Sequence, residues 1–159
     1  MTADGAPTSG TAGVIPPPVL FLGALGAGIA LGYWKPLPLL AHAAVVRIVG
    51  AVLIAAGLAL SAWMSIHFRR SATPVSPLTP TRRLVVSGPY RFSRNPDYIG
   101  QTLVYLGIGL ALNSLWPFIV LVPTLLVLRY AVIAREERYL RRLLGAEYDD
   151  YCRRVRRWL

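Results

Sequence analysis

Charged side chains are scarce in this sequence of 159 residues. They make up 15% of the chain, whereas a soluble domain usually carries about a quarter. Hydrophobic residues make up 55%, which excludes a disordered chain, because such chains are poor in apolar residues. Three stretches, 5–34, 48–68 and 98–128, contain no Asp, Glu, Lys or Arg. Runs of about 20 such residues are typical of membrane-spanning helices, so the sequence predicts an integral membrane protein.

Cysteine, histidine and acidic residues are also few: one Cys, two His and seven Asp or Glu. A single cysteine, Cys152, excludes an intramolecular disulfide. Two distant histidines and one cysteine do not have the spacing of a metal site, so we expect no metal. The 17 Lys and Arg give a net charge of +10. A nucleic-acid-binding protein would not devote its length to apolar runs, so we expect no nucleic-acid partner.

The apolar stretches predict about four transmembrane helices. Residues 1–18 are rich in Thr, Ala, Gly, Ser and Pro and lack the basic region of a signal peptide, so we expect a disordered tail. The remaining residues, 19–159, are expected to form one membrane domain. Its first span is predicted at 19–34 and its second at 43–68.

The third apolar stretch is longer than one span. Asn113 and Ser114 interrupt it, and a serine can cap a new helix whose first turn tolerates proline. We therefore predict a helical hairpin, 97–112 followed by 115–134, with a single long kinked helix as the alternative. Apolar residues beyond the hairpin recur every three or four positions, which predicts an amphipathic cytosolic helix, or a pair of helices broken near Gly145.

Basic residues are concentrated in two segments. The connection 69–97 holds six arginines and one acid, and the segment 129–159 holds nine arginines and five acids, whereas the turn at Asn113 is uncharged. Cytoplasmic loops of membrane proteins are enriched in Lys and Arg. Four spans would therefore place both termini, the connection and an active site on the cytoplasmic side. The excess of arginine over lysine favours a bacterial origin, and hence the bacterial inner membrane.

Two motifs lie at opposite ends of the predicted hairpin. Tyr98 in the first and Glu136 in the second are 38 residues apart. This separation matches two helical passes of about 19 residues each, at a rise of about 1.5 Å per residue. We therefore expect both motifs to return to the same membrane face and to meet.

The first motif, GPYRFSRNPDY at 88–98, has a partly structural explanation. Asn95 is a good N-cap, Pro96 suits the first helical position, and Asp97 in the first turn interacts favourably with the helix dipole. Four residues around this helix start are not explained in that way: Tyr90, Arg91, Arg94 and Tyr98. Free backbone N–H groups with arginines nearby suit a carboxylate or phosphate, while interfacial aromatics and snorkelling arginines are the alternative.

The second motif is the acidic pair Glu136 and Glu137. Surface ion pairs with neighbouring arginines are one explanation, and each contributes little. Alternatively, carboxylates just beyond a membrane span bind a cationic ligand or a ribose diol. A ligand with a carboxylate at one end and positive centres elsewhere would match both motifs.

The ordered set of motifs resembles the isoprenylcysteine carboxyl methyltransferase family, and phosphatidylethanolamine N-methyltransferases are similar in the same region. The motifs are LVVSGPY at 84–90, RNPDY at 94–98, the paired glutamates, and LGAEY at 144–148 followed by Tyr151 and Val155. The resemblance covers about residues 73–158. It implies S-adenosylmethionine as cofactor, bound by this part of a membrane methyltransferase domain on its cytosolic side.

The resemblance also implies ten cofactor-binding residues: Leu84, Val85, Tyr90, Arg94, Asn95, Pro96, Asp97, Tyr98, Glu136 and Glu137. This chain departs from the family at two positions. Asn95 replaces a common histidine, and Val132 replaces an arginine that prenylcysteine-methylating members carry one turn before the paired glutamates. Arg129, a turn earlier, is the expected substitute and hence the expected substrate-binding residue. No catalytic residue is assigned.

The implied reaction is methyl transfer to a lipid-like or isoprenoid acceptor, either a carboxylate or an amine. A carboxylate needs no general base, whereas an amine must lose its proton; His67 is a candidate base, although an interfacial role explains it more simply. A small four-helix transporter is the alternative function, but none of the predicted spans carries the interior acid that such proteins use. A reductase with a nicotinamide cofactor is a third possibility, for which the chain is short.

Overall fold

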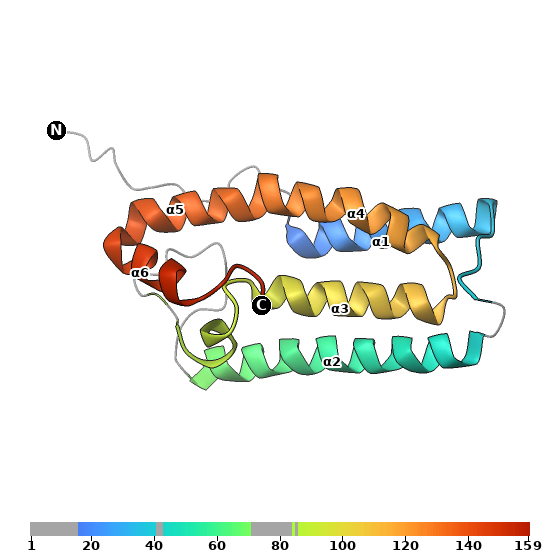
Figure 1. Cartoon of the computed structure of the whole chain (residues 1–159), viewed down its shortest axis with the longest axis horizontal. Coiled ribbons are helices and arrows are strands. Elements are labelled where there is room, and N and C mark those ends of the chain that lie inside the picture. Colours follow the sequence, from blue (N-terminus) through green and yellow to red (C-terminus); the bar gives the residue numbers. More distant parts are fainter. Residues whose placement is uncertain (1–15, 41–42, 71–83, 85) are drawn as a thin grey trace.

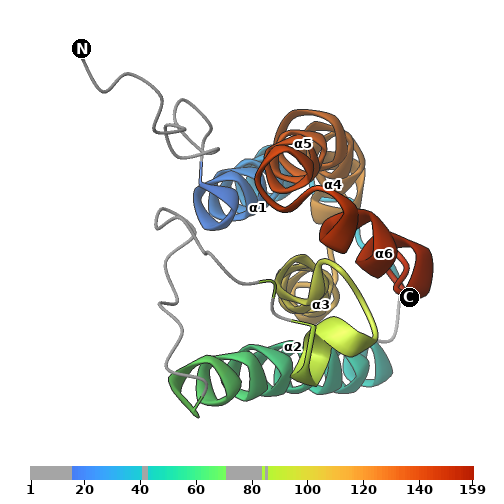
Figure 2. The same cartoon turned by 90° about the vertical axis from the view of Figure 1, so that its left-hand side faces the viewer.

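The computed structural model describes residues 16–40, 43–70, 84 and 86–159, and every regular element in these ranges is a helix. Four helices lie side by side along the longest axis (Figure 1): α1 (Pro17–Trp34), α2 (Ala43–Arg70), α3 (Pro96–Ala111) and α4 (Trp116–Val127). Viewed along the helices, α3 lies between α2 and the pair formed by α1 and α4 (Figure 2). The predicted tail 1–18 lies outside the described residues except for its last three, two of which begin α1.

Among the described residues, three helices are long and apolar enough to cross a membrane: Pro17–Trp34, Ala43–His67 and Trp116–Leu144. The prediction of an all-α membrane protein is confirmed. The remaining predicted span, α3, has 16 residues. At about 1.5 Å per residue it is about 24 Å long, somewhat less than the hydrocarbon thickness of about 30 Å.

The predicted hairpin is confirmed, because α3 ends at Ala111 and α4 begins at Trp116. The alternative of one kinked helix is wrong. The predicted cap by Ser114 is also wrong: Leu115 is the N-cap residue of α4, without a side-chain capping bond. The Ser114 hydroxyl is buried and has no hydrogen-bond partner among the described residues.

The uncharged turn between α3 and α4 contacts the segment that follows α1. Asn113 has a φ of 51°, a left-handed conformation that asparagine adopts more readily than most residues. Its side-chain amide donates to the Leu40 carbonyl at 3.0 Å, and its Oδ1 accepts from the Leu40 N–H at 3.2 Å. The Trp116 indole N–H donates to the Lys35 carbonyl at 2.6 Å. We call this end of the bundle the turn end.

Helices α2 and α3 approach each other closely at two pairs of glycines. A Cβ atom on Gly57 would lie 2.6 Å from the Gly100 carbonyl oxygen, and one on Gly107 would lie 2.6 Å from that of Gly50. No real side chain fits at such a distance, so these positions require glycine. The small residues let the two backbones pack directly against each other.

Helix α4 continues without a break through a π-helical segment, η2 (Leu128–Ile133), into α5 (Ala134–Leu144). Gly145, at a φ of 55°, ends α5, and α6 (Ala146–Arg154) follows. The alternative of two helices broken near Gly145 is therefore confirmed. Figure 1 shows α5, α6 and the chain before α3 together at the end opposite the α3–α4 turn, which we call the polar end.

Candidate functional site

The chain enters α3 at the polar end through a short 3₁₀ helix, η1 (Gly88–Arg91). Gly88 has a φ of 61°, a conformation that favours glycine. Asn95 is the N-cap residue and Pro96 the first residue of α3, as predicted. The Asn95 side chain, however, makes no capping bond. Its amide nitrogen donates instead to the Arg157 carbonyl at 3.0 Å, so it links α3 to the C-terminal segment.

The two motifs of the hairpin meet at Tyr98 and Glu136. The Tyr98 hydroxyl donates to the Glu136 carboxylate, and its distances to Oε1 and Oε2 are 2.8 and 2.9 Å. Tyr98 is buried, at 7% exposure, and Glu136 is half-buried. The prediction that both motifs return to one place is confirmed.

Tyr90 and Asp97 lie close enough to this pair to interact with it electrostatically. Burial raises the pKa of the Tyr90 hydroxyl, and the nearby Asp97 and Glu136 carboxylates raise it further. Tyr90 therefore stays protonated at neutral pH. Asp97 accepts a hydrogen bond from the Gln101 side chain at 2.6 Å. Two carboxylates and two phenol groups thus form a partly buried, electronegative cluster.

Glu137, although adjacent to Glu136, belongs to a different network. It is 7% exposed and receives two hydrogen bonds from Arg157, Nε to Oε1 at 2.9 Å and Nη2 to Oε2 at 2.8 Å. Arg94 Nη1 lies 3.2 Å from Oε1 and also donates to the Cys152 sulfur at 2.8 Å. Arginines therefore occupy both oxygens of Glu137.

The ten residues expected to bind a cofactor fall into three groups. Four form the electronegative cluster: Tyr90, Asp97, Tyr98 and Glu136. Three join the start of α3 to the C-terminal segment: Arg94, Asn95 and Glu137. Of the other three, Pro96 is buried and Leu84 is half-buried, while Val85 lies outside the described residues.

The candidate base, His67, lies near the end of α2 against η1. Its Nε2 is 2.9 Å from the Ser87 hydroxyl oxygen. A Cβ atom on Gly88 would come within 2.9 Å of its ring. These contacts join α2 to the chain that leads into α3, which gives His67 a structural role.

Two residues near the end of the chain contribute to the polar end of the bundle, although the sequence did not indicate this. Arg157 binds Glu137, and Trp158 packs against the buried cluster between α1, α3 and α4. Arg157 is one of four arginines between positions 153 and 157, and nothing in that run distinguishes it. Trp158, directly after this run of arginines, was the one feature of the sequence that could have indicated a buried contact here.

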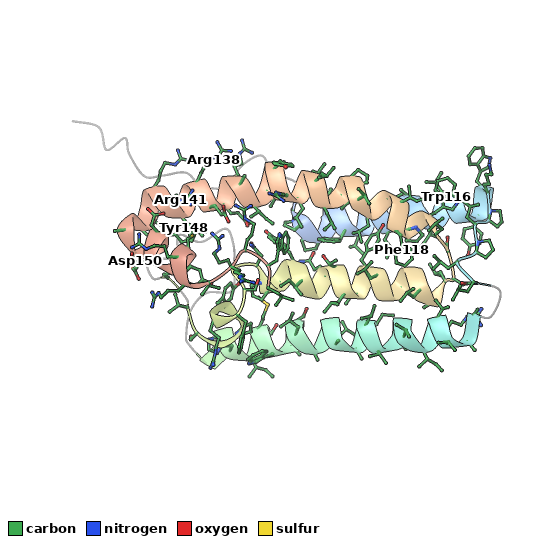
Figure 3. All side chains as sticks on the ribbon, viewed as in Figure 1. Trp116, Phe118, Arg138, Arg141, Tyr148 and Asp150 are labelled. Carbon is green, nitrogen blue, oxygen red and sulfur yellow. The ribbon has the colours of Figure 1, made fainter. Side chains whose placement is uncertain are left out.

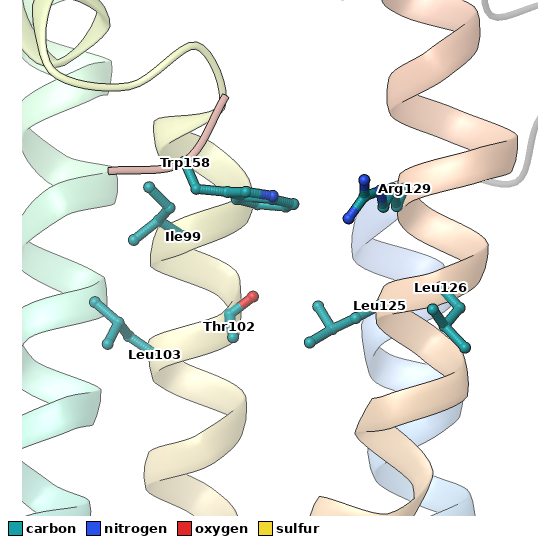
Figure 4. Close-up of a pocket in the computed structure, with 7 residues that line it drawn as sticks. All are labelled: Ile99, Thr102, Leu103, Leu125, Leu126, Arg129 and Trp158. Carbon is teal, nitrogen blue, oxygen red and sulfur yellow. The ribbon is translucent and has the colours of Figure 1, made fainter. Parts of the chain in front are cut away.

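A cavity of about 320 Å³ lies between α3 and α4. Figure 4 shows the residues that line it: Ile99, Thr102, Leu103, Leu125, Leu126, Arg129 and Trp158. The lining is mostly apolar, with one guanidinium at the level of Trp158. Arg129, the expected substrate-binding residue, lines this cavity, whereas Val132 is buried in the core, at 4% exposure. No carboxylate of the described part of the chain forms an ion pair with Arg129.

Fold and site together define an all-α integral membrane protein in which a tyrosine–carboxylate cluster lies at the polar end of an apolar helical bundle. The chain matches the model of the phospholipid methyltransferase family over residues 45–147, more than half its length, and it belongs to this family. It is therefore a membrane methyltransferase. The match is consistent with the resemblance to isoprenylcysteine carboxyl methyltransferases and gives no support to the transporter alternative.

A similar protein is known from Haemophilus influenzae. It is an uncharacterised protein, 37% identical over 62 residues, which cover 39% of this chain and 98% of that protein. No solved structure matches this chain.

Proposed function

We propose that this protein transfers a methyl group from S-adenosylmethionine to a lipid-like acceptor, and that the cofactor binds at Tyr98 and Glu136. The observation that carries the proposal is the hydrogen bonding of Tyr98 to both oxygens of Glu136. It joins two motifs that are 38 residues apart, within the region that matches a methyltransferase family.

The electronegative cluster fits the chemistry of this cofactor. S-adenosylmethionine carries a positively charged sulfur and an ammonium group, together with a ribose diol. Asp97 and Glu136 supply negative charge, and the rings of Tyr90 and Tyr98 attract cations through their faces. Because Glu136 is only half-buried, its carboxylate can also accept hydrogen bonds from a diol.

The protein's main contribution to this reaction is positioning. When bound, the cofactor would supply a methyl group on a positively charged sulfur. In-line displacement at that methyl group needs correct orientation more than covalent help from the protein. The Tyr98–Glu136 bond holds the cofactor site in one geometry, and the mostly aliphatic walls of the cavity beside it lower the local dielectric.

The acceptor that this arrangement favours has an apolar chain next to an anionic group. The cavity walls are aliphatic, and the Arg129 guanidinium lines the cavity without a carboxylate partner among the described residues. Arginine binds carboxylate and phosphate oxygens well. If the acceptor is itself a carboxylate, its charge and that of the sulfonium neutralise each other as the bond forms, so a low dielectric favours the reaction.

We place this site on the cytoplasmic side of a bacterial inner membrane. The polar end carries Arg138 and Arg141 on α5 (Figure 3) among the arginines of the basic C-terminal segment. In contrast, the sequence of α1, the turn after it and the start of α2 contains two basic residues, Lys35 and Arg47. The enrichment of basic residues in cytoplasmic segments supports this orientation.

Calorimetric titration of the purified protein with S-adenosylmethionine tests the cofactor site. We expect the wild type to bind, and Tyr98→Phe and Glu136→Gln each to weaken binding by about tenfold or more, since the first removes the hydrogen bond to the Glu136 carboxylate and the second removes its negative charge. Glu147→Gln, on the exposed surface of α6, is the matched control and should bind like the wild type. Circular dichroism shows whether each variant is folded. Folded variants at both positions with wild-type affinity would refute the proposed site.

Incubation with methyl-labelled S-adenosylmethionine and a membrane lipid extract tests the acceptor class. We expect the label in a lipid product, and in none when the protein is omitted. Label that appears only in water-soluble products would show that the acceptor is not lipid-like.

A further inference from the structure

A second apolar groove, of about 390 Å³, lies between α1 and α4. Its lining contains no charged residue and shares none with the cavity between α3 and α4: Val19, Leu20, Gly23, Ala24, Val120, Pro123, Thr124 and Val127. The one hydroxyl group of this lining, that of Thr124, donates to the Val120 carbonyl at 2.8 Å. Val19 and Val127 are about half exposed, at 55% and 48%. Because both helices are long and apolar enough to cross a membrane, the groove opens towards the hydrocarbon of the bilayer.

Gly23 gives this groove part of its depth. A Cβ atom at this position would meet nothing within 4 Å, so no close contact between the helices requires a glycine here. At Gly28, further along α1, a Cβ atom would lie 2.9 Å from the Pro117 Cα atom. The two helices are therefore in direct contact near Pro117 and leave open space at Gly23, towards the polar end.

The stripe of α4 that lines the groove continues as arginines on α5. Val120 and Val127 are seven residues apart, nearly two turns, and so share one face of the helix. Arg135 follows Val127 by eight residues, but the path passes through η2, whose wider π-helical turn accommodates one additional residue. Arg142 follows Arg135 by another seven. Figure 1 shows that α5 extends beyond the first residues of α1 at the polar end, so these arginines lie beyond the groove on the same side.

Three arginines on this side of α5 form what we call the arginine row: Arg135, Arg138 and Arg142. All three are exposed, and no carboxylate among residues 16–40, 43–70, 84 and 86–159 forms an ion pair with any of them. In contrast, Arg141 of the same helix pairs with Asp149 at 3.0 Å. The row therefore presents positive charge that the described part of the protein does not neutralise.

The guanidinium groups of the row turn back along the helix. Arg138 Nε donates to the Ala134 carbonyl at 3.1 Å, and Arg142 Nε donates to the Arg138 carbonyl at 3.4 Å. Both side chains therefore point towards α4 and the groove, the direction that long side chains usually take in helices. These bonds use Nε and leave the terminal nitrogens of each guanidinium for a ligand.

The height of the row matches the headgroup layer of a bilayer. Trp116 is the first residue of α4, at the turn end. About 20 residues at about 1.5 Å each cross a hydrocarbon core of about 30 Å, so the core that begins at Trp116 ends close to Arg135. Tyr130, 65% exposed on the same continuous helix, is of the residue type that is enriched near this boundary. The row thus lies where the phosphate groups of lipids lie.

We propose that the groove and the arginine row form a binding site for one anionic phospholipid of the bilayer. An acyl chain lies in the groove between α1 and α4, and the phosphate group lies at Arg135 and Arg142. Charge complementarity identifies the occupant, because arginine binds phosphate through paired, charge-assisted hydrogen bonds and the uncharged groove accepts a hydrocarbon chain. Its volume of about 390 Å³ lies in the range of about 300 to 1,000 Å³ for ligand sites. The inference does not depend on the proposed function, since none of these residues belongs to the cofactor cluster.

Native mass spectrometry of the full chain, released from detergent micelles, tests the proposal by counting bound lipid molecules during a titration. Phosphatidylglycerol is the anionic probe, phosphatidylcholine with the same acyl chains is the zwitterionic one, and glycerol phosphate supplies the phosphate group without a chain. We expect one phosphatidylglycerol to bind about tenfold or more tightly than phosphatidylcholine, and glycerol phosphate not to bind at the same concentrations. Equal affinities for the two lipids would refute the arginine row as the recognition element, and tight binding of glycerol phosphate would refute the role of the groove.

The double variant Arg135→Gln/Arg142→Gln removes the phosphate end of the site. Its affinity for phosphatidylglycerol should fall by about tenfold or more, because it loses charge-assisted hydrogen bonds to the phosphate. Arg153→Gln/Arg154→Gln, on the exposed surface of α6, removes the same charge and is the matched control, with an expected change within about twofold. Equal losses in the two double variants would show that net charge alone attracts the lipid, which contradicts a site.

Gly23→Leu removes the chain end of the site, because its side chain occupies the open part of the groove. Affinity for phosphatidylglycerol should fall by about tenfold, the effect of losing about two buried methylene groups. In Gly26→Leu the new Cβ atom also meets nothing within 4 Å, but this position does not line the groove, so the variant is the matched control and should bind like the wild type. Circular dichroism shows whether both are folded. Wild-type affinity in a folded Gly23→Leu protein would rule out the groove as the place of the acyl chain.

Discussion

The two ends of the helical bundle are held together by different kinds of interaction. At the turn end, the Asn113 side chain and the neighbouring backbone bond to main-chain groups of the segment after α1. The polar end also has such bonds to main-chain carbonyls, but there, in addition, charged and phenolic side chains bond to one another, with Arg157 on Glu137 and Tyr98 on Glu136. The turn end therefore tolerates changes of most side chains, whereas the polar end depends on which residues are present.

This difference agrees with the proposed location of the cofactor site. Removing charges from water is costly, and well-packed apolar residues of similar volume often stabilise a fold as much as a buried ion pair does. The charged network at the polar end fits the proposed cofactor site, whose side chains must be held in one geometry.

Removing the central carboxylate of the polar end should have the largest effect on stability. Glu137→Ala leaves Arg94 and Arg157 without their shared partner, and breaking a buried pair in this way costs about 3 to 5 kcal/mol. Denaturant unfolding in detergent measures the change. Asp149→Ala, which removes a half-exposed ion pair with Arg141, is the control and should cost about 1 kcal/mol or less. Equal losses in the two variants would contradict the buried network.

A substitution in the middle of the bundle tests how α2 packs against α3, independently of the interactions at the two ends. Gly57→Ala places a methyl group 2.6 Å from the Gly100 carbonyl oxygen, and overpacking of this kind costs about 1 to 3 kcal/mol. In Gly26→Ala the new methyl group meets nothing within 4 Å, so the variant should gain about 0.5 to 1 kcal/mol from helix propensity. Thermal unfolding compares the two. Similar melting temperatures would show that α2 and α3 do not pack as described.

A change at the turn end should have a smaller effect, confined to stability. Asn113→Ala removes both hydrogen bonds to Leu40 and puts alanine into a left-handed conformation, which together cost about 1 to 2 kcal/mol. S-adenosylmethionine affinity should not change, because the turn lies at the opposite end of the bundle from the cofactor cluster. Calorimetry alongside thermal unfolding tests both parts. Weakened cofactor binding in a folded Asn113→Ala protein would show that the two ends are coupled.

The sequence predicted those features that depend on counting along the chain. The hairpin followed from the length of the apolar stretch, and the meeting of Tyr98 with Glu136 followed from their separation by two helical passes. The break at Gly145 was one of two alternatives, and glycine in a left-handed conformation decided between them. Each of these depends on local geometry, which a single sequence carries.

The features that the sequence did not predict depend on contacts between distant segments. Asn95 has the right residue type for a cap, but the Arg157 carbonyl takes its side chain. The two adjacent glutamates look equivalent in the sequence, and only tertiary structure directs Glu136 to Tyr98 and Glu137 to Arg157. Likewise, four arginines precede Trp158, and the position of Glu137 alone distinguishes Arg157 from the others.

The π-helical segment η2 contains Arg129, the residue proposed to hold the acceptor, and precedes Glu136, a residue proposed to hold the cofactor. Its hydrogen bonds join residues five apart instead of four, so the direction of Glu136 relative to Arg129 differs from that in an ordinary α-helix. Loss of one residue from η2 would turn the whole of α5 by about 100° relative to α4. Every side chain of the cluster would still be present, yet Glu136 would no longer face Tyr98. Relatives that differ in length within η2 would therefore differ in chemistry even where all their polar residues are the same.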